Sequence, residues 1–202
     1  MQVSVELTRT SELVVRNGTR FSDKAYLAFC DANPDLRTER TAEGEIVIVP
    51  PAGFESEDRN SEALAQLRVW ANKDGRGRAT GPTAQFFLPD GSALSPDAAW
   101  TSNELLSRAS HEEKRRFPYL CPEFAIEVLS PSDRLNKSKA KMEQWIANGA
   151  QLAWLIDGDA QTVYVYQANQ PVETRTGLLK LAGKGPVKGF VLQLRTIWEG
   201  VK

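Results

Sequence analysis

Residues 124–129, with the sequence FAIEVL, form the most apolar strand-like segment of the chain. Every position except Glu127 is apolar, which is typical of a strand buried on both faces of a sheet. An ionised carboxylate is costly to bury without a partner, a proton or a metal ion. On a strand, Glu127 shares one face with Ala125 and Leu129, so its side chain either enters the core or emerges at a cleft. Glu127 is therefore the first candidate functional residue.

The sequence after this segment predicts a parallel pair of strands. A helix is expected from Ser132 or Asp133 to Asn148, and residues 151–156 then form a second apolar strand. Strand, helix and strand make a βαβ unit, in which the two strands are parallel. Residues 162–166 return antiparallel after a tight turn. We therefore predict an α/β (α+β) fold with a mixed central β-sheet flanked by helices.

Hairpins are predicted on the N-terminal side of this unit. Residues 36–40 pair with residues 45–49, and residues 78–88 pair with a strand near 98–100. Residues 189–194 are expected to add a last edge strand. These antiparallel pairs, together with the parallel unit, make the predicted sheet mixed.

Three further helices are predicted from their caps. Ser22 is a suitable N-cap for the first of them. Asn60 or Ser61 can cap a second helix that runs through about Lys73. Ser110 begins a capping-box pattern for a short charged helix. These helices would cover the faces of the sheet.

The length and composition fit one globular domain. The chain has 202 residues, 41% of them hydrophobic and 25% charged, so it can bury a sizeable core. We predict an extended or loosely docked arm at residues 1–20 and a single domain over residues 21–202. No apolar stretch is long enough for a membrane span, and the first residues lack the pattern of a secretory signal, so a cytoplasmic protein with no membrane partner is expected.

Charge, cysteine and histidine usage argue against several classes of protein. Lys and Arg number 25 and Asp and Glu 26, for a net charge of -1, so any site for a polyanion must be local. Cys30 and Cys121 lie far apart without CxxC spacing, which argues against a disulfide scaffold or a structural zinc site. His111 is the only histidine, so histidine-based triads and most zinc chemistry are excluded.

A second carboxylate stands at the start of another predicted strand. Asp97 follows Pro96 directly after a hairpin. If the two strands are neighbours, Asp97 and Glu127 lie at the ends of adjacent strands and could share one hard cation. Mg²⁺ takes one or two carboxylates, together with water and substrate phosphate oxygens. The pairing of the two strands is an inference from the order of the elements.

The helix after Glu127 carries a cluster of positive charge. At 100° per residue, Lys141 lies beside Trp145 at one shoulder of the buried stripe, so it can reach back toward the sheet. Lys139 flanks the opposite shoulder. Between positions 134 and 141 there are four cations and no acid, which would make an edge that attracts phosphate. The four cations are Arg134, Lys137, Lys139 and Lys141.

Four segments, in this order, resemble a known family. They are SPDAAW at 95–100, CPEFAIEVLSPSD at 121–133, KMEQW at 141–145 with Asn148-Gly149, and WLID at 154–157. They resemble the Uma-two family of restriction-endonuclease-like proteins, which belongs to the PD-(D/E)XK nuclease superfamily. The resemblance covers roughly residues 20–198. It implies a restriction-endonuclease-like mixed sheet with an N-terminal hairpin.

The resemblance also implies roles for individual residues. Asp97 matches the first metal-binding Asp of the superfamily, and Glu127 matches the second acid. The usual Lys two positions after that acid is replaced by Leu129. The family pattern places a lysine on the following helix instead, where it matches Lys141. Catalysis would then rest on Asp97, Glu127 and Lys141.

The implied cofactor is Mg²⁺, with Mn²⁺ as a substitute. Asp97 and Glu127 would hold it, with the backbone carbonyl of Val128 as a further ligand. An early helix often supplies another acid in this superfamily, and Glu62 is the candidate. Such a site would hydrolyse phosphodiester bonds.

Three functions remain open at this point. The first is a magnesium-dependent DNA endonuclease, with Arg134, Lys137 and Lys139 against the DNA, expected to be a homodimer because a twofold pair of sites cuts both strands most simply. The second is a catalytically weak or inactive nuclease-fold module that binds nucleic acid or protein, favoured by Leu129 and the near-neutral charge. The third is a phosphoesterase for smaller phosphate esters.

Overall fold

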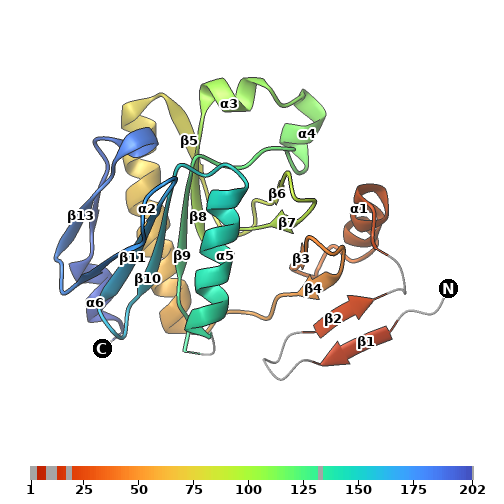
Figure 1. The fold of residues 1–202 in the computed structure, drawn as a ribbon, viewed down its shortest axis with the longest axis horizontal. Coiled ribbons are helices and arrows are strands. Elements are labelled where there is room, and N and C mark those ends of the chain that lie inside the picture. Colours follow the sequence, from red (N-terminus) through yellow and green to blue (C-terminus); the bar gives the residue numbers. More distant parts are fainter. Residues whose placement is uncertain (1–3, 8–12, 17–19, 132–133, 202) are drawn as a thin grey trace.

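The structure is a computed structural model that describes residues 4–7, 13–16, 20–131 and 134–201. Over these residues the chain folds into two six-stranded β-sheets, one two-stranded sheet and six α-helices (Figure 1). This mixed architecture is the predicted fold class. No helix in the described part of the chain has both the length and the apolar character needed to cross a membrane.

One six-stranded sheet, the central sheet, contains the apolar segment. Its strand order is β12-β11-β10-β9-β8-β5. Strands β9 and β10 are parallel, and the other neighbours are antiparallel, so the predicted βαβ unit and the mixed sheet are confirmed. The strands are β5 (Gly77–Thr80), β8 (Ala98–Ser102), β9 (Phe124–Val128), β10 (Leu152–Asp157), β11 (Thr162–Gln167) and β12 (Glu173–Thr176).

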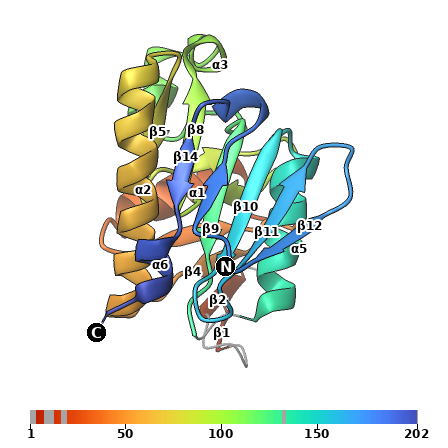
Figure 2. The same cartoon turned by 90° about the vertical axis from the view of Figure 1, so that its left-hand side faces the viewer.

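Helices α2 (Phe54–Asp74) and α5 (Leu135–Ala147) cover opposite faces of the central sheet (Figure 2). Alternation along β9 sends Phe124 and Ile126 into the core under α2. It sends Ala125 into a second core with Met142 of α5. Burial on both faces explains why β9 is almost wholly apolar.

The second six-stranded sheet has the order β1-β2-β4-β3-β7-β6. Strands β3 and β4 form the predicted hairpin. Residues 1–20, expected to be an arm, contribute β1 and β2, and β2 pairs with β4. The strands are β1 (Ser4–Leu7), β2 (Leu13–Arg16), β3 (Thr38–Arg40), β4 (Ile46–Ile48), β6 (Phe86–Phe87) and β7 (Ala93–Leu94).

The predicted start of α2 is wrong. The helix begins at Phe54, with Gly53 as its N-cap, rather than at Asn60 or Ser61. These two polar residues look like caps but serve other contacts inside the helix. Asn60 donates a hydrogen bond to Asp97, and the hydroxyl of Ser61 donates to Glu57 one turn earlier. A residue that favours N-cap positions can therefore lie within a helix when its side chain forms a hydrogen bond with another group.

The remaining helices are short, and two of the predicted caps are confirmed. Ser22 accepts a hydrogen bond from the amide of Ala25, and Ser110 forms the capping box with Glu113. The start predicted for α5, at Ser132 or Asp133, falls outside the described residues, and Arg134 is the observed N-cap. The short elements are α1 (Asp23–Ala32), α3 (Asn103–Ser107), α4 (His111–Arg115), a 3₁₀ turn (Gly185–Val187) and α6 (Arg195–Glu199).

The C-terminal strand does not extend the central sheet as predicted. Strand β14 (Val191–Gln193) pairs with β13 (Lys180–Ala182) in a separate two-stranded sheet. The alternating apolar residues Phe190, Leu192 and Leu194 are buried in the core beneath α2. The apolar side chains of β14 are thus buried against a face of the central sheet, and the strand does not pair with the edge of that sheet.

A buried arginine links β3 to the loops around it. Arg40 is 1% exposed, pairs with Asp23 at 2.5 Å and donates to the carbonyls of Gly91 and Phe21. Its guanidinium also lies 5.1 Å from the centre of the Phe87 ring. Every contact depends on the planar, multiply donating head group. Arg40 therefore fixes the position of the second sheet and its turns.

Arg40→Met is expected to lower the free energy of unfolding by about 2–3 kcal/mol, because it leaves buried carbonyl oxygens without a donor. Urea denaturation measures the difference. Arg78→Met on β5 is the matched control, since Arg78 is exposed. Equal losses in the two variants would contradict the structural role of Arg40.

Candidate active site

The two predicted acids lie together at one end of the central sheet. Strands β8 and β9 are antiparallel, and Ala98 of β8 lies opposite Ile126 of β9. Asp97, the residue before Ala98, therefore lies beside Glu127, the residue after Ile126. The Oδ2 atom of Asp97 accepts a hydrogen bond of 2.8 Å from the amide of Val128. The structure thus places Asp97 at the end of the strand next to Glu127, as the order of elements suggested.

Glu127 is buried against α5. It is 9% exposed, and its Oε1 atom accepts from the indole nitrogen of Trp145 at 2.9 Å and lies 3.0 Å from the ammonium of Lys141. Burial raises the pKa of Glu127. The ammonium of Lys141 and the hydrogen bond from Trp145 lower this pKa in part, whereas the nearby carboxylates of Asp97 and Glu39 raise it further. Among the described contacts both donors meet Oε1, so Oε2 is the oxygen of Glu127 left for another ligand.

Lys141 lies between two carboxylates. Its Nζ atom is 3.0 Å from Glu127, 3.1 Å from Glu39 Oε1 and 3.0 Å from the carbonyl of Ser95. Burial alone would lower the pKa of Lys141, but the carboxylates of Glu127, Glu39 and Asp97 raise it above the ordinary value. An ammonium has three protons, and three acceptors surround this one. Lys141 is therefore held as a cation and cannot serve as a proton acceptor.

Glu39 is a member of this cluster that sequence reasoning missed. It comes from β3 of the second sheet and lies 102 positions before Lys141 in the chain. Its Oε1 atom also accepts from the amide of Ser95 at 3.0 Å. The only sequence signal is alternation in β3, which sets Glu39 on the opposite face from the buried Thr38 and Arg40. Nothing in that pattern indicates what the carboxylate faces.

Helix α2 brings Asn60, not Glu62, to the cluster. The Nδ2 atom of Asn60 donates to Asp97 Oδ1 at 3.3 Å. Its Oδ1 atom is buried and has no hydrogen-bond partner in the described part of the protein. The carboxylate of Glu62 instead accepts from Gln66 at 2.7 Å and from Thr196 at 3.1 Å, beside α6. No contact of Glu62 with Asp97 is found among the described residues.

The oxygens at this end of the sheet suit a hard cation. Asp97 and Glu127 offer carboxylates, and the unpartnered Oδ1 of Asn60 is an amide oxygen, the kind of donor that Mg²⁺ and Ca²⁺ accept. Within residues 4–7, 13–16, 20–131 and 134–201, no group of three or more His, Cys, Asp and Glu side chains could hold a metal ion. A cation would therefore combine two carboxylates with neutral oxygens. The contact recorded for Val128 is through its amide, and its carbonyl remains a predicted ligand.

The predicted DNA-facing cations lie on the first half of α5. Arg134 and Lys137 are exposed. The ammonium of Lys139 lies 4.3 Å from the centre of the Tyr164 ring, so a cation–π contact holds it against the sheet. Lys141 points toward the acids, as the 100° arithmetic of the helix indicated.

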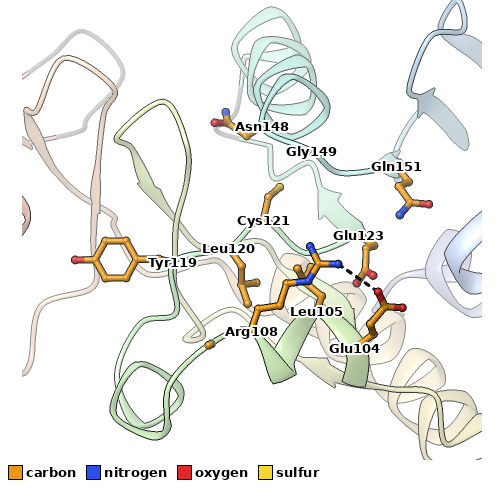
Figure 3. Close-up of a pocket in the computed structure, with 11 residues that line it drawn as sticks. Glu104, Leu105, Arg108, Tyr119, Leu120, Cys121, Glu123, Asn148, Gly149 and Gln151 are labelled. Atoms are coloured by element: carbon orange, nitrogen blue, oxygen red, sulfur yellow. Dashed lines mark hydrogen bonds and ion pairs between the residues drawn. The ribbon is translucent and has the colours of Figure 1, made fainter.

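A pocket of about 510 Å³ lies at the opposite end of β9 and does not contain these groups (Figure 3). Its charged side chains have partners: Arg108 pairs with Glu104 at 3.2 Å, and Glu123 accepts from the amide and the hydroxyl of Ser102. Burial raises the pKa of the Cys121 thiol to about 12, so this cysteine is protonated at neutral pH and is no nucleophile. The pocket therefore offers no reactive group.

Comparison with known proteins identifies the family. A family model described as "Uma2: Putative restriction endonuclease" matches residues 23–195. The chain belongs to the Uma2 family. No curated protein matches it. The crystal structure of a "putative nuclease belonging to DUF820" from Anabaena variabilis is similar, with a TM-score of 0.68, 23% identity, and coverage of 82% of this chain and 91% of that chain.

Uma2 membership confirms the resemblance read from the four segments, and the crystal structure shows the same fold at low identity. The family description supports a nuclease-like function for this Uma2 chain. The geometry adds that two acids and one lysine from adjacent elements converge, with Glu39 and Asn60 completing the polar cluster. We refer to Asp97, Glu127, Lys141, Glu39 and Asn60 as the acid–lysine cluster.

Proposed function

We propose that this Uma2 protein is a metal-dependent endonuclease that hydrolyses phosphodiester bonds in DNA. The observation that carries the proposal is the convergence of Asp97, Glu127 and Lys141 at the end of β9. Glu127 is buried and Asp97 is half-buried, and holding two carboxylates side by side there has a cost that a shared cation would offset. All three residues lie within residues 23–195, the range that the family model matches.

Asp97 and Glu127 would hold Mg²⁺ or Mn²⁺, and Asn60, whose Nδ2 donates to Asp97, would supply a neutral amide oxygen. When bound, such an ion lowers the pKa of a water ligand and offsets charge on a phosphate oxygen. Lys141 supplies positive charge beside this position and stabilises the negative charge that develops on the phosphate in the transition state. Since its protons are held by three acceptors, Lys141 acts through charge and orientation rather than as a base.

A second candidate function is a nuclease-fold module that binds DNA without cutting it. One observation favours it: the ammonium of Lys141 already neutralises Glu127, so it competes with a divalent ion for that carboxylate. The homodimer and the cytoplasmic location remain proposals in both cases. A twofold dimer would present one site to each strand of a duplex.

Incubation of the purified protein with supercoiled plasmid separates these functions. With Mg²⁺ or Mn²⁺ we expect nicked and then linear plasmid, and with EDTA we expect no change. Retarded but intact plasmid in the presence of either metal would favour the binding module. Hydrolysis of small phosphodiesters without any cleavage of plasmid would instead indicate a phosphoesterase.

A further inference from the structure

A second pocket, of about 540 Å³, lies next to the acid–lysine cluster. Its lining residues come from the end of α1 and the connection to β3, from the turn between β5 and β6, and from the end of α4. Ser95 lines it, and the backbone of Ser95 contacts Glu39 and Lys141. The pocket therefore opens beside the residues proposed to cut the phosphodiester.

Arg37 is the unexplained residue of this pocket. It is half-buried, and its Nε atom is fully buried with no hydrogen-bond partner in the described residues. The backbone carbonyl of Arg37 accepts from the amide of Val49, so strand pairing needs only its main chain. A buried donor on a charged group without an acceptor is an exception that calls for an unseen partner. The strongest hydrogen bonds of a guanidinium are those to an anion such as a carboxylate or a phosphate.

The charges around Arg37 leave a positive excess. Arg115 and Arg116 line the same pocket, as do Asp31 and Asp35. Arg116 pairs with Asp31 at 2.5 Å, so these two charges cancel. For Arg115, which is exposed, no ion pair is found among the residues described. Two arginines therefore face one remaining acid, and a planar guanidinium binds phosphate in a bidentate way.

We propose that this pocket holds a phosphate group of the DNA strand near the bond that is cut, with Arg37 as its main ligand and Arg115 as a second. The inference rests on the proposed function, because it assigns a substrate contact to the same site. Phosphate contacts fix the register of a protein on DNA and carry no sequence information. The volume lies in the range of about 300–1,000 Å³ typical of small-molecule sites, so the pocket has room for the nucleotide attached to that phosphate.

The test is binding of a short fluorescent DNA duplex in EDTA, measured by anisotropy over a series of salt concentrations. Arg37→Gln is expected to weaken binding by about tenfold and to lower the slope of log affinity against log salt by about one. Arg78→Gln, which removes the same charge from exposed β5, should leave the slope unchanged. Arg115→Gln is the second variant, because Arg115 is exposed and its loss should not disturb folding; it should show a smaller effect of the same sign.

Several outcomes would overturn the pocket assignment. The first is that Arg37→Gln and Arg115→Gln both keep the affinity and the salt slope of the wild type. The second is that Arg78→Gln loses as much affinity as Arg37→Gln. The third is that the wild type does not bind the duplex. Stabilisation of the wild type alone by inorganic phosphate, without an effect of Arg37→Gln on DNA, would assign the pocket to a free phosphate and also overturn it.

The binding assay contains no divalent metal, so it does not depend on cleavage. Intact plasmid together with a clear Arg37 effect would overturn the nuclease function and leave the phosphate contact standing. Cleaved plasmid without an Arg37 effect would overturn the phosphate contact alone.

Discussion

Glu127→Gln is expected to lower the rate of plasmid cleavage by about a thousandfold or more while leaving the fold intact. A bound divalent ion supplies several kcal/mol of transition-state stabilisation, and each 1.36 kcal/mol is a factor of ten in rate. Glutamine keeps an oxygen that can accept from Trp145 and Lys141 but removes the negative charge that would hold the ion. Asp97→Asn should have an effect of similar size.

The folded state should tolerate this change. Burial raises the pKa of Glu127, so the folded protein binds a proton there more readily than the unfolded chain does. Ionisation of Glu127 above that pKa therefore lowers the stability of the fold instead of adding to it. The neutral amide removes this cost, and we expect the melting temperature of Glu127→Gln in EDTA to stay near that of the wild type or to rise.

Glu104→Gln is the matched control, because the side chain of Glu104 forms an exposed ion pair with Arg108 at the far end of the sheet. It should cleave plasmid like the wild type. Binding of Mn²⁺, followed by electron paramagnetic resonance, should weaken in Asp97→Asn and Glu127→Gln only. If these two variants cleave as fast as Glu104→Gln, the reaction takes place elsewhere on the protein.

The middle of the central sheet, from β9 to β11, could be predicted because its signals are local. The apolar run of β9, the helix after it and the return strands follow from burial and periodicity along one stretch of chain. The start of α2 and the place of β14 could not be predicted in this way. In both cases a tertiary contact overrides the local pattern: Asn60 bonds Asp97 instead of capping, and Leu192 packs on a face instead of extending an edge.

The residues of the candidate site also fall into those that local patterns place and those that tertiary contacts place. Asp97 precedes β8, Glu127 lies in the neighbouring strand β9, and Lys141 lies on α5, the helix that follows β9, so strand ends and helix geometry were enough to bring them together. Arg37 lies in the connection into β3, and Glu39 lies in β3 itself, which belongs to the other sheet. Their positions depend on how that sheet docks, and no periodicity along the chain encodes the docking. Contacts at high sequence separation are thus the part that needed the structure.

The cluster also predicts how Lys141 and a divalent ion depend on each other. Lys141→Met is expected to destabilise the metal-free protein by about 3 kcal/mol, because it leaves Glu127 and Glu39 buried without their cation. Their side chains are 11% and 16% exposed, so water can replace little of the lost charge. Protonation of Glu127 would relieve part of this cost, and urea unfolding is therefore measured in mildly alkaline buffer with EDTA.

Mg²⁺ should then restore more stability to Lys141→Met than it adds to the wild type, since the ion no longer competes with the ammonium for Glu127. Plasmid cleavage by this variant should nevertheless fall, because the charge that stabilises the transition state is gone. Lys139→Met is the matched control on the same helix, where the cation–π contact with Tyr164 is lost. Equal stabilisation of the wild type and both variants by Mg²⁺ would mean that the ion does not bind at Glu127, and the acid–lysine cluster would then be a structural ion pair.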